Sequence, residues 1–283
     1  MKFNDFSEFN ERNAPSMEKR CEIAVKLAQE AGELTLRYFN RDDLGVERKS
    51  DGSPVTLADR GAEELVRRRV AELYPEDAIL GEEFDDKEGT SGYRWIVDPI
   101  DGTKSFITGV PLYSTLIGIE KDGEPVVGVL WLPALGRGIW AEKGKGAWRF
   151  GDVSEPTPAR VDATVDRLED ALFLTSDAFD FDKVGRDGAY DEIERKVWLT
   201  RTWGDAYGYY LVATGKAQIM IDPYFEIWDA APLKTILEEA GGFFGDWQGN
   251  ATIRGREGVA TNAKLKDAVV EILRRYQKTK EPH

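Results

Sequence analysis

Apolar side chains recur every three to four residues near the start of the chain. Residues 16–39 keep this spacing through Ile23, Leu27 and Leu34, which is typical of an amphipathic helix. Residues 58–73 repeat the pattern. The sequence therefore predicts two long helices, and a turn-rich stretch over residues 49–56 leads into the second.

Short apolar runs replace the helical period after Pro75. Strands are predicted at residues 78–81, 94–97, 114–120, 125–132, 138–141 and 146–150. Lys121-Asp122-Gly123-Glu124 separates two of these runs. An Asp-Gly pair between two strand-like runs is a hairpin signal, so we expect an antiparallel set of strands here.

Helices and strands alternate in the second half of the chain. The pattern predicts strands at 171–175 and 217–221, and helices at 190–195, 205–214, 230–240 and 264–277. Residues 177–191 carry five Asp, which favours a solvated loop. A polar segment with two prolines, 152–158, marks a lobe boundary. We therefore expect an α+β lobe over 1–155 and an α/β lobe over 156–283, packed as one continuous unit.

Composition limits the chemistry that this chain can perform. The 283 residues carry a formal net charge of −14, with one cysteine, Cys21, and one histidine, His283. An intrachain disulfide, a zinc site built on cysteines, a His general base and a Ser-His-Asp triad are therefore excluded. The negative charge argues against a nucleic-acid partner. No apolar window is long enough to span a membrane and no secretory signal is visible, so we expect a cytoplasmic protein.

The densest chemical signal is the run Asp98-Pro99-Ile100-Asp101-Gly102-Thr103. A predicted strand ends at Asp98, and the turn at Pro99 returns Asp101 to the same side. Two carboxylates so close together repel each other unless a cation lies between them. A helix that begins near Thr103 would add free N–H groups for an anion. The alternative is a surface Asp-Gly turn in which an Asp caps the helix.

Two further segments place carboxylates at the ends of predicted elements. Glu82 and Glu83 follow the strand at 78–81, and Asp229 opens the helix at 230–240. Asp229 could also be a plain helix cap. Three acidic ends in a chain without usable His or Cys favour Mg²⁺, which prefers oxygen ligands and works together with substrate phosphates.

These segments resemble the three signature blocks of the inositol monophosphatase superfamily. The blocks are Gly81-Glu82-Glu83, then Asp98 to Thr103, then Trp228-Asp229 with Glu239-Ala240-Gly241-Gly242 downstream. Their order and spacing match over residues 16–278. DGTKSFITGVPLYSTLIGI from Asp101 and RTWGDAYGY from Arg201 are most similar to the bacterial histidinol-phosphatase branch. The resemblance implies a layered α-β-α-β-α sugar-phosphatase-type fold and Mg²⁺-dependent hydrolysis of a phosphomonoester.

The resemblance also implies a ligand set for two or three Mg²⁺ ions. Glu82, Asp98 and the Ile100 carbonyl would hold the first ion. Asp98, Asp101 and Asp229 would hold the second, and a third, weaker ion would lie near Glu82. Most metal and phosphate ligands would thus come from the 1–155 lobe, whereas Asp229 and the substrate residues would come from the 156–283 lobe.

Phosphate and water contacts follow from the same resemblance. Gly102 and Thr103 would offer backbone N–H groups to the phosphate, beside Asp101 and Asp229. The Thr103 hydroxyl would also face the attacking water.

The resemblance also implies that Glu82, Thr56 and an acid close to Thr56 in the sequence help to activate this water. The family's position three residues before Thr56 holds Ser53 here, so Asp51 is the candidate. The alternative is that Asp51 only forms an Asp-Gly turn.

Substrate choice depends on two further carboxylates. Histidinol phosphate carries an ammonium and an imidazole, for which Asp205 and Asp222 are candidate partners; Asp222 precedes Asp229 by seven residues. Arg201 would hold these two carboxylates in place or contact the substrate. Alternatively, Asp205 caps a helix and Asp222 starts a turn.

The resemblance leaves several functions open. The leading hypothesis is a histidinol-phosphate phosphatase of histidine biosynthesis that acts on a small phosphorylated metabolite as a homodimer. The alternatives with the same chemistry are an inositol-1-monophosphatase, a fructose-1,6-bisphosphatase and a 3′-phosphoadenosine nucleotidase. A metal-binding regulatory protein without turnover is the non-enzymatic alternative.

Overall fold

The structure is a computed structural model that describes residues 16–41, 44–49 and 53–279. Its larger sheet has the strand order β3-β4-β5-β6-β7-β8-β9. β3 is parallel to β4, and the other pairs are antiparallel. The strands are β3 (Ala78–Gly81), β4 (Tyr93–Asp101), β5 (Ser114–Lys121), β6 (Glu124–Leu132), β7 (Arg137–Glu142), β8 (Gly146–Phe150) and β9 (Thr157–Pro158). The predicted antiparallel set and its hairpin at Asp122-Gly123 are confirmed.

The smaller sheet has the order β11-β10-β12-β14-β13. β10 is parallel to β11 and β12, whereas β14 runs antiparallel to β12 and β13. The strands are β10 (Leu172–Leu174), β11 (Leu199–Arg201), β12 (Ile219–Asp222), β13 (Gly242–Gly245) and β14 (Gly258–Asn262). The sequence pattern indicated only β10 and β12.

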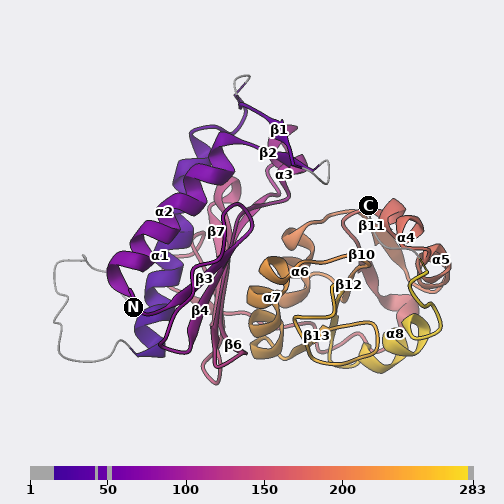
Figure 1. The fold of residues 1–283 in the computed structure, drawn as a ribbon. Helices are drawn as coiled ribbons and strands as arrows, with labels where there is room; N and C mark the ends of the chain where they lie inside the picture. Colours follow the sequence, from indigo (N-terminus) through magenta and orange to yellow (C-terminus); the bar gives the residue numbers. More distant parts are fainter. Residues whose placement is uncertain (1–15, 42–43, 50–52, 280–283) are drawn as a thin grey trace.

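Helices lie on both sides of each sheet (Figure 1). α1 (Met17–Leu36) and α2 (Leu57–Leu73) cover the outer face of the larger sheet, α6 (Ala206–Ala213) and α7 (Ile227–Glu239) lie between the sheets, and α4 (Ala178–Lys183), α5 (Asp187–Glu194) and α8 (Lys266–Leu273) cover the smaller one. The layered α-β-α-β-α fold is therefore confirmed. A short β1–β2 hairpin (Glu47–Arg48, Pro54–Val55) and α3 (Thr103–Ile107) complete the edge near the acidic segments.

Two glycines determine how closely α7 approaches the larger sheet. A Cβ atom on Gly128 of β6 would lie 2.1 Å from the Pro232 carbonyl oxygen, and one on Gly118 of β5 would lie 2.9 Å from the Cβ atom of Ala231. Real Cβ atoms do not come so near, so a side chain at either position would push α7 outward. This close packing places the first turn of α7, with Asp229, at the sheet.

The expected acidic loop at 177–191 is wrong, because these residues form α4 and the first half of α5. Asp177 caps α4 by accepting a hydrogen bond from the Phe179 N–H at 2.9 Å. Phe181 and Ala189 are fully buried against the smaller sheet. The charged residues therefore occupy the outer side of helices whose inner side belongs to the core.

The predicted lobe boundary at 152–158 ends with β9, which still pairs with β8 of the larger sheet. α7, from the later part of the chain, also packs on that sheet. Among the described residues, no helix is both long and apolar enough to cross a membrane.

Candidate active site

β4 carries two carboxylates near its C-terminal end, at one end of the larger sheet. It pairs regularly with β5 up to Asp98 opposite Leu116, and the register then shifts before Asp101 opposite Ser114. Asp98 Oδ1 accepts a hydrogen bond from the Ile100 N–H at 3.0 Å, within the turn that Pro99 begins. The irregularity therefore re-aims Asp101 beside Asp98, as the sequence predicts.

Asp101 also connects this strand to α6. Its Oδ2 atom accepts hydrogen bonds from the Ser114 hydroxyl and the Ala206 N–H, both at 2.9 Å. Because Ala206 is the first residue of α6, the contact holds the start of a distant helix beside the edge of β4.

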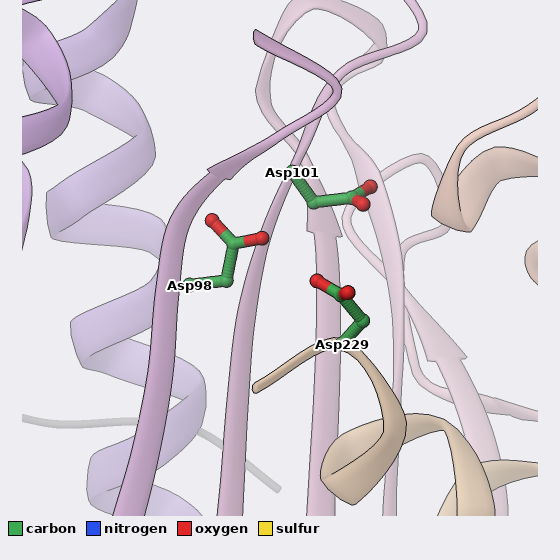
Figure 2. A group of neighbouring side chains, drawn as sticks. All are labelled: Asp98, Asp101 and Asp229. Carbon is green, nitrogen blue, oxygen red and sulfur yellow. The ribbon is translucent and has the colours of Figure 1, made fainter. Parts of the chain in front are cut away.

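Asp229 joins these two carboxylates from α7. It is the third residue of the helix and closes a capping box, in which its Oδ2 accepts a hydrogen bond from the Glu226 N–H at 3.0 Å. Figure 2 shows Asp98, Asp101 and Asp229 facing one another. One oxygen from each residue can be chosen so that all lie within 4.8 Å of one another. Asp229 is therefore both a capping residue and a member of a three-carboxylate cluster.

The cluster is electrostatically costly when it is ionised. Burial raises the pKa of Asp98 and of Asp101 well above the usual range, and the neighbouring carboxylates add to the effect. Burial and the charge of Glu82 raise the pKa of Asp229 to about 8. Three oxygen donors that repel one another suit a hard divalent cation, which would remove the repulsion. The three carboxylates therefore fit a divalent cation, as the resemblance of the sequence implies.

Glu82 lies beside Asp98 of the cluster, and a lysine also holds its carboxylate. Its Oε1 atom accepts a hydrogen bond from Lys49 Nζ at 2.7 Å, and Lys49 also donates to Glu83 Oε1 at 2.6 Å. The charge of Glu82 still contributes to the raised pKa of Asp98. A Cβ atom on Gly81 would lie 2.0 Å from Oε1 of Glu63. A side chain at this position would therefore have to displace the Glu63 carboxylate, which Arg67 and the Glu83 N–H hold.

Gly102 and Thr103 form the start of α3 next to the cluster. Gly102 has φ +81°, and a Cβ atom there would lie 2.5 Å from Asp205 Oδ2. Both observations require glycine at this position. The Thr103 hydroxyl donates to the Ile100 carbonyl oxygen at 3.2 Å. One turn thus contains Gly102 and Thr103, the candidate N–H donors to the phosphate, and Ile100, whose carbonyl is the candidate metal ligand.

The sequence interpretation overlooked Asp59, which lies three residues after Thr56. Asp59 Oδ2 accepts hydrogen bonds from the Thr56 N–H at 2.7 Å and from its hydroxyl at 2.6 Å. Oδ1 is buried and has no hydrogen-bond partner among the described residues. Burial, with a smaller contribution from Glu82, raises the pKa of Asp59 to about 6. The Thr-x-x-Asp capping-box spacing is the signal that identifies Asp59, whereas Asp51 lies outside the described residues.

The candidate substrate residues differ in how they are held. Asp222, at the end of β12, is buried and accepts hydrogen bonds from Thr175 Oγ1 (3.2 Å), the Ser176 N–H (2.9 Å) and Tyr209 Oη (2.9 Å). Asp205 precedes α6 but makes no capping hydrogen bond with its side chain. It lies against Gly102 instead.

Arg201 is exposed at the end of β11. Its guanidinium donates to the Thr200 carbonyl oxygen at 2.7 Å. The described contacts of Arg201 therefore do not include Asp205 or Asp222.

Comparisons with known proteins find relatives over most of the chain. The model of the inositol monophosphatase family matches residues 16–278. The chain is 41% identical to a histidinol-phosphatase of Chlorobaculum parvum, over 89% of this chain and 95% of that protein, and 40% identical to one of Mycobacterium tuberculosis, over 88% and 95%. Among solved structures, a Thermotoga maritima IMPase superposes with a TM-score of 0.80 at 28% identity and covers 90% of this chain and 97% of that one.

Proposed function

Because the chain belongs to the inositol monophosphatase family, we propose that it is a Mg²⁺-dependent histidinol-phosphate phosphatase, which hydrolyses L-histidinol phosphate to L-histidinol and phosphate in histidine biosynthesis. The observation that carries the proposal is the meeting of Asp98, Asp101 and Asp229 from two distant segments. Relatives at 37–41% identity, named histidinol-phosphatases, support the choice of substrate.

Two or three Mg²⁺ ions would be held by Asp98, Asp101 and Asp229, with Glu82 and the Ile100 carbonyl as further oxygen donors. Bound Mg²⁺ supplies positive charge that acidifies water and neutralises the leaving oxygen. Lys49 Nζ donates to Oε1 of Glu82, so the other oxygen of this carboxylate, Oε2, would be the one offered to a metal ion. Lys49 pairs with Glu83 as well.

The chain itself contributes positioning around the phosphate. The transition state of phosphoryl transfer spreads charge over oxygen atoms, so fixed N–H groups and positive charge stabilise it. Gly102 and Thr103 offer their N–H groups at the start of α3, beside Asp101. No protein nucleophile is required, which agrees with a chain whose single cysteine is buried.

Asp59 is a better supported proton acceptor for the attacking water than Asp51. Thr56 orients the Asp59 carboxylate through two hydrogen bonds to a single oxygen, which leaves Oδ1 without a partner in the described part of the chain. Its raised pKa, about 6, lies near the neutral range in which a general base works best. Asp51 stays a prediction.

Substrate recognition is assigned mainly to Asp205. Its carboxylate lies beside Gly102 without capping α6, so it can face the ammonium or imidazole of the substrate. Asp222, which already accepts three hydrogen bonds, would act by positioning Ser176 and Tyr209 at the wall of the site. Arg201 would approach the substrate from the exposed rim.

A panel of substrates with and without Mg²⁺ tests the proposal. We expect L-histidinol phosphate to give a higher kcat/KM than inositol-1-phosphate, fructose-1,6-bisphosphate or 3′-phosphoadenosine 5′-phosphate, and a chelator to abolish all turnover. Preference for another member of the panel would reassign the substrate, whereas full activity in chelator would contradict the metal-dependent mechanism.

Asp205→Asn tests the origin of the specificity. We expect kcat/KM for histidinol phosphate to fall by about 10²-fold, because a charged hydrogen bond is lost, while 4-nitrophenyl phosphate is hydrolysed nearly as before. Asp267→Asn on α8, which is exposed, is the matched control. Equal losses on both substrates would remove the specificity role of Asp205.

The cytoplasmic location and the homodimer also belong to this proposal. Sedimentation velocity of the purified chain checks the homodimer, for which the expected mass is twice 31.8 kDa.

A further inference from the structure

A cavity lies at the opposite end of the larger sheet from the carboxylate cluster. Strand register places it there: β4 ends at Asp101 opposite Ser114, where β5 begins, whereas β7 ends at Glu142 opposite Val127, near the start of β6. The cavity has a volume of about 380 Å³ and is lined by the first turns of α1 and by β7 and β8. No residue of the carboxylate cluster lines it.

Strand alternation explains which side chains face this cavity. Ile139 and Ala141 of β7 point into the core shared with α7. Trp140 and Glu142 therefore point to the opposite face, which α1 covers. Trp148 of β8 pairs directly with Trp140, and the two indole rings stack at 6.2 Å with an interplanar angle of 19°. Both indoles line the cavity.

Glu142 is the unusual residue of this wall. Only 5% of it is exposed, and no side chain or N–H among the described residues donates a hydrogen bond to its carboxylate. Burial raises its pKa; Lys145 acts in the opposite direction, although it forms no ion pair with Glu142, and the charges of Glu18 and Glu22 raise the pKa further. The Glu142 carboxylate faces the cavity and forms no ion pair with a described residue, so this position is suited to an external cation.

The charge and shape of the whole lining point to the same class of ligand. Four carboxylates, from Glu18, Glu22, Glu142 and Glu155, line the cavity together with one ammonium group, that of Lys145; Glu22 is also paired with Lys19 at 3.1 Å. The remaining lining is mainly apolar and aromatic, which disfavours a small hydrated metal ion and favours an organic body. Indole faces attract cations and flat rings.

We propose that this cavity binds a small organic cation, a primary amine carried on a flat apolar ring. The ammonium group would donate to Glu142, and the ring would lie against Trp140 and Trp148. Since the cavity and the carboxylate cluster lie at opposite ends of the sheet, this ligand and the substrate would not contact each other. The proposal does not depend on the substrate assigned above.

Calorimetry with the full chain and 2-phenylethylamine as the probe tests the site. Mg²⁺ and inorganic phosphate are present throughout, so that the carboxylate cluster is occupied. We expect saturable binding of the amine, quenching of tryptophan fluorescence, and no binding of the neutral isostere 2-phenylethanol. Absence of amine binding, or equal binding of the alcohol, would overturn the proposal.

Variants locate the binding. Glu142→Gln keeps the size of the side chain and should weaken amine binding at least tenfold, whereas Glu271→Gln, an exposed change on α8, should leave it unaltered. Lys145→Met removes the competing ammonium and should tighten binding several-fold. Thermal unfolding verifies that each variant is folded, and Trp148→Leu gives a second test of the aromatic wall. Unchanged affinity in folded Glu142→Gln would place the ligand elsewhere.

Discussion

Buried carboxylates in this protein differ in whether the chain supplies a cation to pair with them: Asp77 has one, and the cluster of Asp98, Asp101 and Asp229 has none among the described residues. Asp77, 1% exposed, is held by its own cation: Arg20 donates to both of its oxygens, each at 2.8 Å. Trp95 Nε1 and the Ser91 hydroxyl donate to it as well, at 2.9 and 2.6 Å. Asp98, 2% exposed, accepts a hydrogen bond from the Ile100 N–H, and the charged groups that act on it among the described residues are the carboxylates of Glu82, Asp101 and Asp229.

The pKa directions express this difference. Burial alone would raise the pKa of Asp77, but the hydrogen bonds from Arg20, Ser91 and Trp95 hold it below its usual value. Burial and neighbouring charges raise the pKa of Asp98, Asp101 and Asp229. A buried carboxylate with a cation supplied by the chain stabilises the fold, whereas one without such a cation is prepared to bind something from solution.

The largest expected effect is the loss of activity when a carboxylate of the cluster is neutralised. Asp98→Asn should lower kcat by about 10³-fold or more, which corresponds to about 4 kcal/mol of lost transition-state stabilisation. It should leave the thermal midpoint unchanged or higher, since one repelling charge is removed. Steady-state kinetics and Mg²⁺ titration calorimetry measure this. Near-normal turnover would show that Asp98 does not hold the metal.

The reverse result is expected for Asp77→Asn. Removal of this charge leaves Arg20 buried without its partner, so the free energy of unfolding should fall by about 3 kcal/mol. The activity per folded molecule should stay within about twofold. Urea unfolding and active-site titration check both statements, and a selective loss of kcat would break the distinction between the two groups.

Asp59 should behave as a member of the catalytic group. Asp59→Asn is expected to lower kcat by about 10²-fold, because a general base is lost, while Mg²⁺ affinity changes little. Asp51→Asn is the comparison variant. If Asp51→Asn causes the larger loss, the water-activating role belongs to Asp51 and not to Asp59.

The smallest expected effect, measured per pH unit, is a dependence of stability on pH that has opposite signs for Asp229 and Asp77. In metal-free protein, Asp229 has a folded-state pKa of about 8 against 3.8 in the unfolded chain, so its contribution destabilises increasingly as pH rises from about 4 to 8, by at most about 1.4 kcal/mol per pH unit. The Asp77 contribution is instead present above pH 4 and is lost as pH falls through its lowered pKa. Denaturant titrations of Asp229→Asn and Asp77→Asn across this range separate the two slopes, and Mg²⁺ should flatten the first. The same slope with and without Asp229 would contradict its raised pKa.

Much of the fold follows from local sequence patterns. The predicted strands at 78–81 and 146–150 have the observed bounds, and α1 and α2 lie within a few residues of their predicted limits. These segments combine a clear apolar period with recognisable ends, such as the Ser16 cap of α1. β11 escaped prediction because only one of its three residues, Leu199, is apolar, whereas all three residues of β10 are. α4 escaped because a helix of six residues carries too few positions to establish a period.

The sequence by itself determined which chemistry is available: oxygen ligands and carboxylates, in a chain with one buried cysteine and a histidine only at its end. It also placed Asp98, Asp101 and Asp229 at the ends of elements. Only the tertiary structure decided which acids meet. The approach of α7 over Gly118 and Gly128 sets the position of Asp229, and the presence or absence of a neighbouring cation distinguishes Asp77 from Asp98. Such partners lie far apart along the chain, and local patterns contain no information about contacts at that separation.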